Sequence, residues 1–360
     1  MAGVRIVEIS SFVAVPLAGM TLAQLGAEVV RIDPVGGAAD YHRWPLTGSG
    51  ESIYWAGLNK GKRSMEVDMR SAEGQSLVQR LIAAAGVFIT NVSGRQWHSY
   101  PTLRGMRPDL IQLEVVGRSD GATGVDYTVN AATGFPLVTG PDGHVGPVNH
   151  VMPAWDVSCG LYAVVSVLAA LRRRDLTGSG SEIRLPLDDV ALATAANLGF
   201  LTEVMVTGVQ RPRLGNAIFG QYGRDFVSSD GVSFMVVALT PRHFRDLVSL
   251  TGTADAVAAL ESALSLDLDE EGTRYEHRDA LDGLFAPWFA AHTAAEVAAA
   301  LGASSVLWER YRDFAEVAAS PRVTENPLFS LLDQPGIGTY PAPGLPMSFG
   351  GTHTVPAPAP

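Results

Sequence analysis

Asp156 is the first residue of the chain whose type and position could support chemistry. It stands in the run Pro153-Ala154-Trp155-Asp156-Val157, directly before an apolar stretch that reaches about Leu171. In the first turn of a helix, unpaired backbone N–H groups and the positive end of the helix dipole favour an ionised carboxylate. Asp156 is therefore either a helix cap or a nucleophile. Taken alone, the residue favours the cap, because Asp is among the commonest capping residues.

A second chemical feature is the basic run Asn59-Lys60-Gly61-Lys62-Arg63, which places three cations beside a glycine. Cations of this kind bind phosphates, and a glycine lets a ligand approach the backbone closely. The same composition is also typical of a solvated surface loop. The run by itself favours the surface loop.

The composition limits the class of protein that could carry these residues. The chain has 360 residues, of which 47% are hydrophobic and 18% charged, so it is a globular protein of about two domains. The net charge of −11 argues against nonspecific nucleic-acid binding. The single cysteine, Cys159, excludes a disulfide framework and a multi-cysteine metal site, and predicts a reducing compartment.

The apolar segment from Val157 to Leu171 also bears on where the protein works. It is too short to span a bilayer and is followed at once by Arg172, Arg173 and Arg174. The first residues read as a strand and lack the features of a secretory signal. We therefore expect a cytoplasmic, soluble protein with no membrane partner.

The elements that must position Asp156 and the basic run follow an α/β pattern. The residues predict a strand over 5–8, a helix over 16–25 and a strand over 28–32, an order that gives a right-handed βαβ unit in a parallel sheet. A further helix over 72–84 and strands over 87–89, 110–116 and 182–185 continue it, with a helix over 188–196. The N-terminal part is therefore Rossmann-like. The helix that carries Asp156 should end at the three arginines.

A dinucleotide site is one reading of this unit, with Asp33 on the ribose hydroxyls. The first strand–helix turn, residues 10–16, contains no glycine, so a pyrophosphate could not approach the backbone. We expect no NAD, and Asp33 as a strand-end residue.

A shift toward glycine, aromatic and polar residues over 215–230 marks the start of a smaller α+β domain. It should contain a strand over 234–239 and helices around 243–250, 254–264 and 275–291. Thr293 and Glu296 form a capping box for one more helix. The proline- and glycine-rich segment from Ser320 should be extended over another surface or disordered.

Several segments, taken in order, resemble family III CoA-transferases, the carnitine dehydratase and bile-acid-inducible group that includes α-methylacyl-CoA racemase. No single piece is decisive, but the ordered set is specific and spans nearly the whole chain. The matching residues are 4–8 with 16–20, 22–34, 58–64, 124–127, Asp156 followed by Gly160, and 177–180.

The resemblance implies a large CoA-binding domain built from residues 1–200 and 320–360 and a small domain over 215–310. It implies a homodimer whose subunits interlock, with coenzyme A bound as acyl-CoA. Relatives also bind the nucleotide through the loop after the second strand, and carry an arginine where this chain has Ser93. The implied CoA-binding residues are Asn59, Lys60, Lys62, Arg63, Arg43 and, in place of Ser93, Arg95.

For Asp156 the resemblance implies covalent catalysis without metal or ATP. The carboxylate attacks an acyl-CoA thioester to give an anhydride, and the CoA thiolate then forms an aspartyl-CoA thioester. Racemases of the family need acid/base groups at the positions of Val125 and Thr240, which neither residue can supply. The sequence thus favours a transferase, with a racemase or epimerase and a catalytically silent CoA-binding protein as alternatives.

Within the family, residues 126–136 and 146–151 look most like the mesaconyl-CoA C1–C4 transferases, also called 2-methylfumaryl-CoA isomerases. These move CoA between the two carboxyls of one branched, unsaturated diacid, and an arginine within 211–224 could hold the free carboxylate. His150 could instead be structural, and Cys159 a small core residue. The native acyl group, and intramolecular versus intermolecular transfer, stay open. The substrate-binding candidates are Val125, Asp126, Tyr127, His150 and Gln221.

Overall fold

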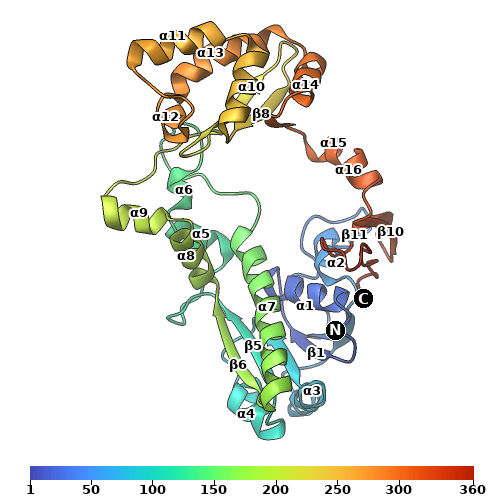
Figure 1. The fold of residues 1–360 in the computed structure, drawn as a ribbon. Coiled ribbons are helices and arrows are strands. Elements are labelled where there is room, and N and C mark those ends of the chain that lie inside the picture. Colours follow the sequence, from blue (N-terminus) through green and yellow to red (C-terminus); the bar gives the residue numbers. More distant parts are fainter. The chain divides into compact units, whose positions relative to one another are not determined.

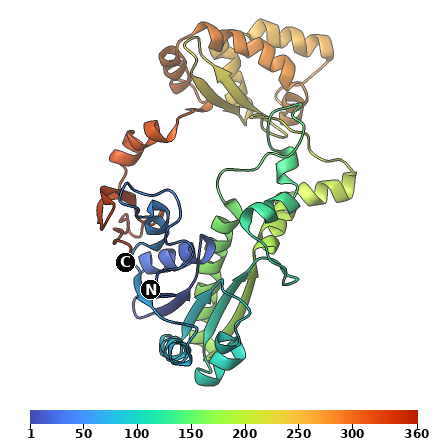
Figure 2. The ribbon, with the colours of Figure 1, turned by 180° about the vertical axis from the view of Figure 1, so that it is seen from behind.

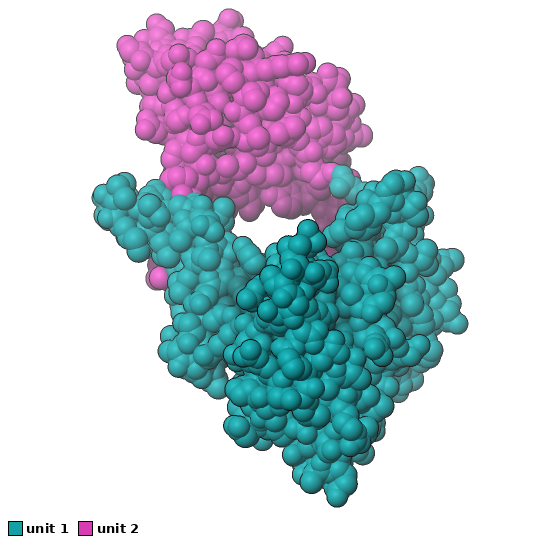
Figure 3. Space-filling view, turned by 60° about the horizontal axis from the view of Figure 1, so that its bottom comes forward, with its two compact units in different colours: residues 1–134, 149–210, 318–360 teal, residues 135–148, 211–317 magenta.

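The computed structural model describes all 360 residues and divides into two compact units (Figure 3). The large unit comprises residues 1–134, 149–210 and 318–360, and the small unit residues 135–148 and 211–317. Residues 135–148, which the sequence placed in the large domain, belong to the small unit. The reason is Arg213, whose guanidinium donates to the carbonyls of Thr139 and Gly146 and so fastens the segment.

The large unit is built on a six-stranded parallel sheet, as predicted from the βαβ pattern. The strand order is β3-β2-β1-β4-β5-β6, so the order reverses between β1 and β4. In open sheets of this kind, ligands bind beyond the carboxyl ends of the strands at this reversal. The strands are β1 (Arg5–Ile9), β2 (Glu28–Asp33), β3 (Arg63–Glu66), β4 (Val87–Thr90), β5 (Ile111–Val116) and β6 (Ser181–Pro186).

Helices cover both faces of this sheet (Figures 1 and 2). On one face lie α1 (Ala14–Gln24) and α7 (Ala154–Thr177), and on the other α3 (Ala72–Ala85) and α4 (Tyr100–Met106). The second face buries Val7, Phe88 and Ile82 in one apolar cluster. The remaining helices of the large unit are α2 (Ile53–Asn59), η1 (Gln96–His98), α5 (Asp126–Ala132), α8 (Leu187–Asn197), α9 (Phe200–Thr207) and α16 (Pro321–Thr324). Helix α15 (Phe314–Ala318) belongs to the small unit except for its last residue.

Helix α7 is longer than the sequence predicted. It runs through the three arginines and ends at Gly178, whose φ of 71° closes the helix in the left-handed region. Arg174 bonds the carbonyl of Gly86, so the basic run is anchored in helical form rather than ending the helix. With 24 residues, α7 is long and apolar enough for a membrane span by length and composition alone. The length argument against a span therefore does not hold.

The segment after Ser320 is extended and packs on an earlier part of the large unit, which is the first of the two predicted alternatives. It forms an antiparallel hairpin of β10 (Phe329–Gln334) and β11 (Gly338–Pro343). Ala359 then packs on Trp55, and its backbone N–H donates to the side chain of Gln334. Prolines of β11 are tolerated because β11 pairs with one neighbour only.

The small unit combines a three-stranded antiparallel sheet with helices, an α+β arrangement. Phe226, Phe285 and Phe289 fill its core, and the helix predicted over 275–291 is interrupted at His277. The capping box of Thr293 and Glu296 is present, with the backbone N–H of Thr293 donating to Glu296. Its elements are α6 (Phe135–Val138), β7 (Tyr222–Val227), β8 (Ser233–Ala238), β9 (Leu307–Arg310), α10 (Pro241–Thr251), α11 (Ala254–Leu264), α12 (Glu271–Glu276), α13 (Arg278–Ala291) and α14 (Ala294–Gly302).

Candidate active site

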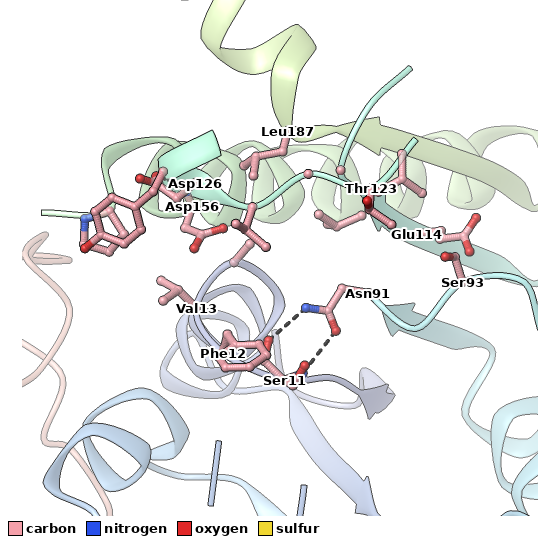
Figure 4. Close-up of a pocket in the computed structure, with 18 of the residues that line it drawn as sticks. Ser11, Phe12, Val13, Asn91, Ser93, Glu114, Thr123, Asp126, Asp156 and Leu187 are labelled. Atoms are coloured by element: carbon pink, nitrogen blue, oxygen red, sulfur yellow. Dashed lines mark hydrogen bonds between the residues drawn. The ribbon is translucent and has the colours of Figure 1, made fainter. Parts of the chain in front are cut away.

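A cavity of about 870 Å³ lies in the large unit where the strand order reverses. The turn after β1 and the loop after β4 meet there, and Asn91 ties them through two hydrogen bonds to the backbone of Ser11 (Figure 4). Asp156 and Asp126 lie at one end of the cavity, and Glu114 and Ser93 at the other. Four predicted site residues besides Asp156 line it: Arg43, Val125, Asp126 and Tyr127.

Asp156 occupies the third position of α7 and does not cap it. The cap is Asp126, whose Oδ2 accepts from the backbone N–H groups of Trp155 at 2.7 Å and Asp156 at 3.1 Å. The other oxygen of Asp126 lies 3.0 Å from Nε2 of His150. Because Asp126 takes over the capping role, the carboxylate of Asp156 is left without a hydrogen bond or ion pair in the subunit.

The environment of Asp156 raises its pKa from 3.8 to about 6. Burial is the main cause, the negative charge of Asp126 adds to it, and the positive charge of Arg43 opposes it. A carboxylate with a raised pKa is a stronger nucleophile than an ordinary one and still ionises at neutral pH. The perturbation, together with the position in a cavity, is typical of a functional group.

Arg43 is held at this end of the cavity by two aromatic rings. Its guanidinium carbon lies 5.4 Å from the ring centre of Phe12 and 5.1 Å from that of Tyr54. Phe12 adopts a φ of 65°, a conformation that residues with a side chain seldom take. The turn is fixed because the Phe12 N–H donates to Asp40 at 2.9 Å.

Beneath the cavity lies a buried charge cluster of Glu8, Arg31, Asp33, Asp40 and Lys62. Arg31 donates to Asp33 and Asp40, and Lys62 donates to Glu8 at 2.8 Å. Asp40 thus links the cluster to the turn that carries Phe12. Asp33 lies in this interior cluster, where its carboxylate accepts hydrogen bonds from Arg31.

Three of the predicted phosphate-binding residues belong to the interior instead of a surface loop. Asn59, Lys60 and Lys62 are each at most 5% exposed. Burial lowers the pKa of both Lys60 and Lys62 to about 8, and Lys62 also donates to Asn59 and the carbonyl of Pro16. A direct phosphate contact by Lys62 would require its pair with Glu8 to open. Arg63 is exposed and pairs with Glu28 at 2.8 Å.

A second cavity, of about 730 Å³, lies beyond the ends of β1 and β2. Arg95 lines it, as does Arg70, and Ser11 borders both cavities. Arg95 is the predicted replacement for the arginine absent at Ser93.

The remaining predicted residues lie away from the carboxylate of Asp156. His150 contacts Asp126 from outside the cavity lining, and Gln221 is in the small unit, where it donates to Glu271 at 3.0 Å. Burial and the charge of Asp156 raise the pKa of Cys159 to about 12, so its thiol stays protonated. Cys159 is a buried core residue, as expected.

Sequence reasoning missed several cavity residues. Tyr54 gave no signal, because nothing local relates α2 to Arg43. Glu114 and Arg184 are partners on β5 and β6 near the carboxyl ends of the strands, a position that a topology-based search would have indicated. Arg70, which follows β3, carries the same signal. No group of three or more His, Cys, Asp or Glu side chains in the chain is arranged to hold a metal ion.

A Rossmann-like sheet here carries an unpaired aspartate near the start of a long helix, a carboxylate suited to nucleophilic catalysis. The whole chain, residues 1–360, matches the model of CoA-transferase family III, and the protein belongs to this family. The fold agrees: a crystal structure of a CAIB/BAIF family protein from Brucella suis superposes with a TM-score of 0.83, at 25% identity, over 100% of this chain and 95% of that one.

Two relatives narrow the comparison. The chain is 48% identical to the 2-methylfumaryl-CoA isomerase of Chloroflexus aurantiacus over 99% of its own length and 90% of that protein. It is 33% identical to the succinate–glutarate CoA-transferase of Agrobacterium fabrum over 70% of its own length and 66% of that protein. Both are transferases or isomerases of CoA thioesters by name, in agreement with the sequence-based prediction.

Proposed function

We propose that this protein moves CoA between carboxylates through a CoA thioester on Asp156, and that both carboxylates belong to one branched, unsaturated diacid. The observation that carries the proposal is the unpaired carboxylate of Asp156, set in a cavity that shares the lining residue Ser11 with a second cavity. The similarity to a 2-methylfumaryl-CoA isomerase supports the intramolecular form.

The reaction begins when Asp156 attacks the thioester carbonyl of the acyl-CoA. The C–S bond breaks, CoA leaves as thiolate, and an acyl-aspartyl anhydride forms. The thiolate then attacks the aspartyl carbonyl, which releases the acyl group as a carboxylate and leaves CoA as a thioester on Asp156. Attack by the second carboxylate of the diacid reverses both steps. Each intermediate keeps the energy of the thioester bond, so no ATP is consumed.

CoA would lie with its thiol at Asp156 and its nucleotide in the second cavity. Arg95 and Arg70 line that cavity and supply the charge that phosphates need. Exposed Arg63 could add to the local positive field. Lys60 and Lys62 would then support the loop from inside, since burial keeps their ammonium groups away from the cavities.

We infer further that the protein acts as a cytoplasmic homodimer. Helix α9 has no buried residue, and Met205 and Val206 are about four-fifths exposed, at 80% and 79%. An apolar helix surface of this kind is stabilised by a partner. Light scattering on the purified protein tests the subunit count.

The function is tested by mass spectrometry after incubation with 2-methylfumaryl-CoA and trapping with hydroxylamine or borohydride. The expected result is modification confined to the peptide that carries Asp156, together with formation of the isomeric thioester. Asp156→Ala should give neither product, and Cys159→Ser is the matched control, because Cys159 lies one turn away with a protonated thiol.

Two results would count against the proposal. Transfer activity retained by Asp156→Ala would exclude the aspartyl thioester. Uptake of solvent deuterium at the α-carbon of a 2-methylacyl-CoA, without an adduct, would instead indicate a racemase.

A further inference from the structure

We propose that Arg43 binds the carboxylate of the acyl group that is not joined to CoA, and that it retains the released diacid beside Asp156 during transfer. The inference rests on the proposed function and assigns a substrate-binding role to a residue that the sequence placed with the CoA nucleotide.

The first argument is the position of the guanidinium. Arg43 lines the same cavity as Asp156 and lies against the ring faces of Phe12 and Tyr54. It forms no ion pair within the subunit, although its charge reaches Asp156 strongly enough to oppose the rise of that residue's pKa. A planar guanidinium fixed by two rings presents its remaining N–H groups in a rigid fork, which suits bidentate binding of a carboxylate.

The second argument is that the other arginines considered for this role act on groups other than Asp156. Arg184, also in the cavity, lies opposite Glu114 on the neighbouring strand and lowers the pKa that burial raises for that carboxyl. In the small unit, Arg213 donates to backbone carbonyls and Arg224 to Asp282. Arg43 is the cavity cation whose charge acts on the nucleophile itself.

The third argument is that the fold holds Arg43 through its backbone. Its N–H donates to the carbonyl of Asp40 at 3.1 Å, and its carbonyl accepts from the hydroxyl of Ser52. Asp40 is buried and bonded to Arg31, so the loop is tied to the charge cluster. Replacing the guanidinium therefore leaves these loop contacts in place.

The chemistry explains why such a cation is needed. Once CoA is bound to Asp156, the diacid has no covalent bond to the enzyme and carries two negative charges. A cation that binds either carboxylate keeps the diacid in the cavity while the other carboxylate turns toward the aspartyl thioester. Without it, the diacid would escape and an external carboxylate could take its place.

The test compares Arg43→Gln and Arg43→Lys with the wild type on two acyl-CoAs that differ in one group. One is 2-methylfumaryl-CoA, and the other is (E)-2-methylbut-2-enoyl-CoA, in which a methyl group replaces the free carboxylate. Arg80→Gln, which removes an exposed charge on α3, is the matched control and should behave as wild type. Loading of CoA onto Asp156 is measured by mass spectrometry, and exchange by adding ¹³C-labelled 2-methylfumarate.

For Arg43→Gln we expect the apparent KM for loading from 2-methylfumaryl-CoA to rise by about 10- to 100-fold, the size of a lost charge-assisted hydrogen-bond pair. Loading from the methyl analogue should change by less than about 3-fold, and the share of product that contains external label should rise. Arg43→Lys should fall between, because an ammonium keeps the charge without the fork.

Equal losses on both acyl-CoAs would overturn the inference, since they would place Arg43 on CoA itself. Unchanged loading and unchanged label in all variants would overturn it as well. Absence of any Asp156 adduct in the wild type would instead contradict the proposed function, whatever the variants do.

Discussion

Two regions of the large unit take carboxylates out of water in opposite ways. In the buried charge cluster, Arg31 and Lys62 bond the acids around them. In the cavity, Asp156 has no bonded cation, and its pKa rises to about 6. Removing one partner of a buried ion pair destabilises the fold, whereas a buried carboxylate without a cation has a raised pKa, which is typical of functional sites. The difference supports the proposal that Asp156 is the nucleophile more strongly than its place in a helix does.

The cluster should respond to the loss of a cation with the larger stability change. Arg31→Met leaves Asp33 and Asp40 buried and unpaired, and we expect the free energy of unfolding to fall by about 3–5 kcal/mol. Urea denaturation measures it. Arg63→Met is the matched control, because this arginine is exposed in its pair with Glu28 and should cost less than about 1 kcal/mol. Equal effects of the two variants would remove the contrast.

Neutralising Asp156, the carboxylate without a bonded cation, should change the free energy of unfolding in the opposite direction. Asp156→Asn should abolish transfer yet raise the free energy of unfolding by up to about 3 kcal/mol at pH 7.5, the cost of a pKa raised from 3.8 to about 6. The raised pKa means that the folded protein binds the proton more tightly, so wild-type stability falls as pH rises from about 4 to 6. The gain in Asp156→Asn should accordingly vanish near pH 4.

A matched control for this gain is Asp282→Asn. Asp282 is also buried, but it is bonded to Tyr222 and Arg224. Burial raises the pKa of Asp282 as well, but its neutralisation should still destabilise the protein, because Arg224 loses its charged partner. Denaturation curves at pH 4 and 7.5 measure the stability change of both variants. A stabilising Asp282→Asn would contradict the proposed difference between bonded and unbonded buried carboxylates.

The smallest expected effect concerns Asp126. Asp126→Asn keeps an oxygen that can cap α7, so the loss of stability should be about 1 kcal/mol or less. It removes a charge that raises the pKa of Asp156, so the pH at which loading is half-maximal should move below that of the wild type. A purely structural role for Asp126 would lower stability without moving this midpoint.

Local patterns predicted the parts of the fold that local contacts determine. The βαβ unit and the capping box at Thr293 depend on periodicity and on residues three apart, which a sequence displays directly. The β10–β11 hairpin was missed because Pro341 and Pro343 mask a strand that has one partner only. The C-terminal end of α7 was predicted too early, because Arg174 is held by a hydrogen bond to the carbonyl of Gly86, which is distant in the sequence.

A site residue could be predicted where the order of family-like segments along the chain pointed to it. It could not be predicted where contacts with distant side chains determine its surroundings. Asp156 was named from its ordered neighbours. The interior position of Lys62 depends on Glu8, 54 residues away, and that of Arg43 on the rings of Phe12 and Tyr54. Such pairings arise from tertiary structure. The sequence alone therefore does not show whether these basic residues contact a phosphate or lie in the interior.

The pairing of late and early segments has a consequence for how the chain folds during synthesis. The carbonyl of Pro358 accepts from the N–H of Gly61, and Ala359 packs on Trp55. The large unit therefore contains contacts between residues about 300 positions apart in the sequence. Residues 211–317 leave the ribosome before these contacts can form, and their unit can collapse first. The loop that contains Lys60 and Lys62 therefore receives these packing partners only after residues 358 and 359 have been synthesised, and the large unit should be the slower of the two to mature.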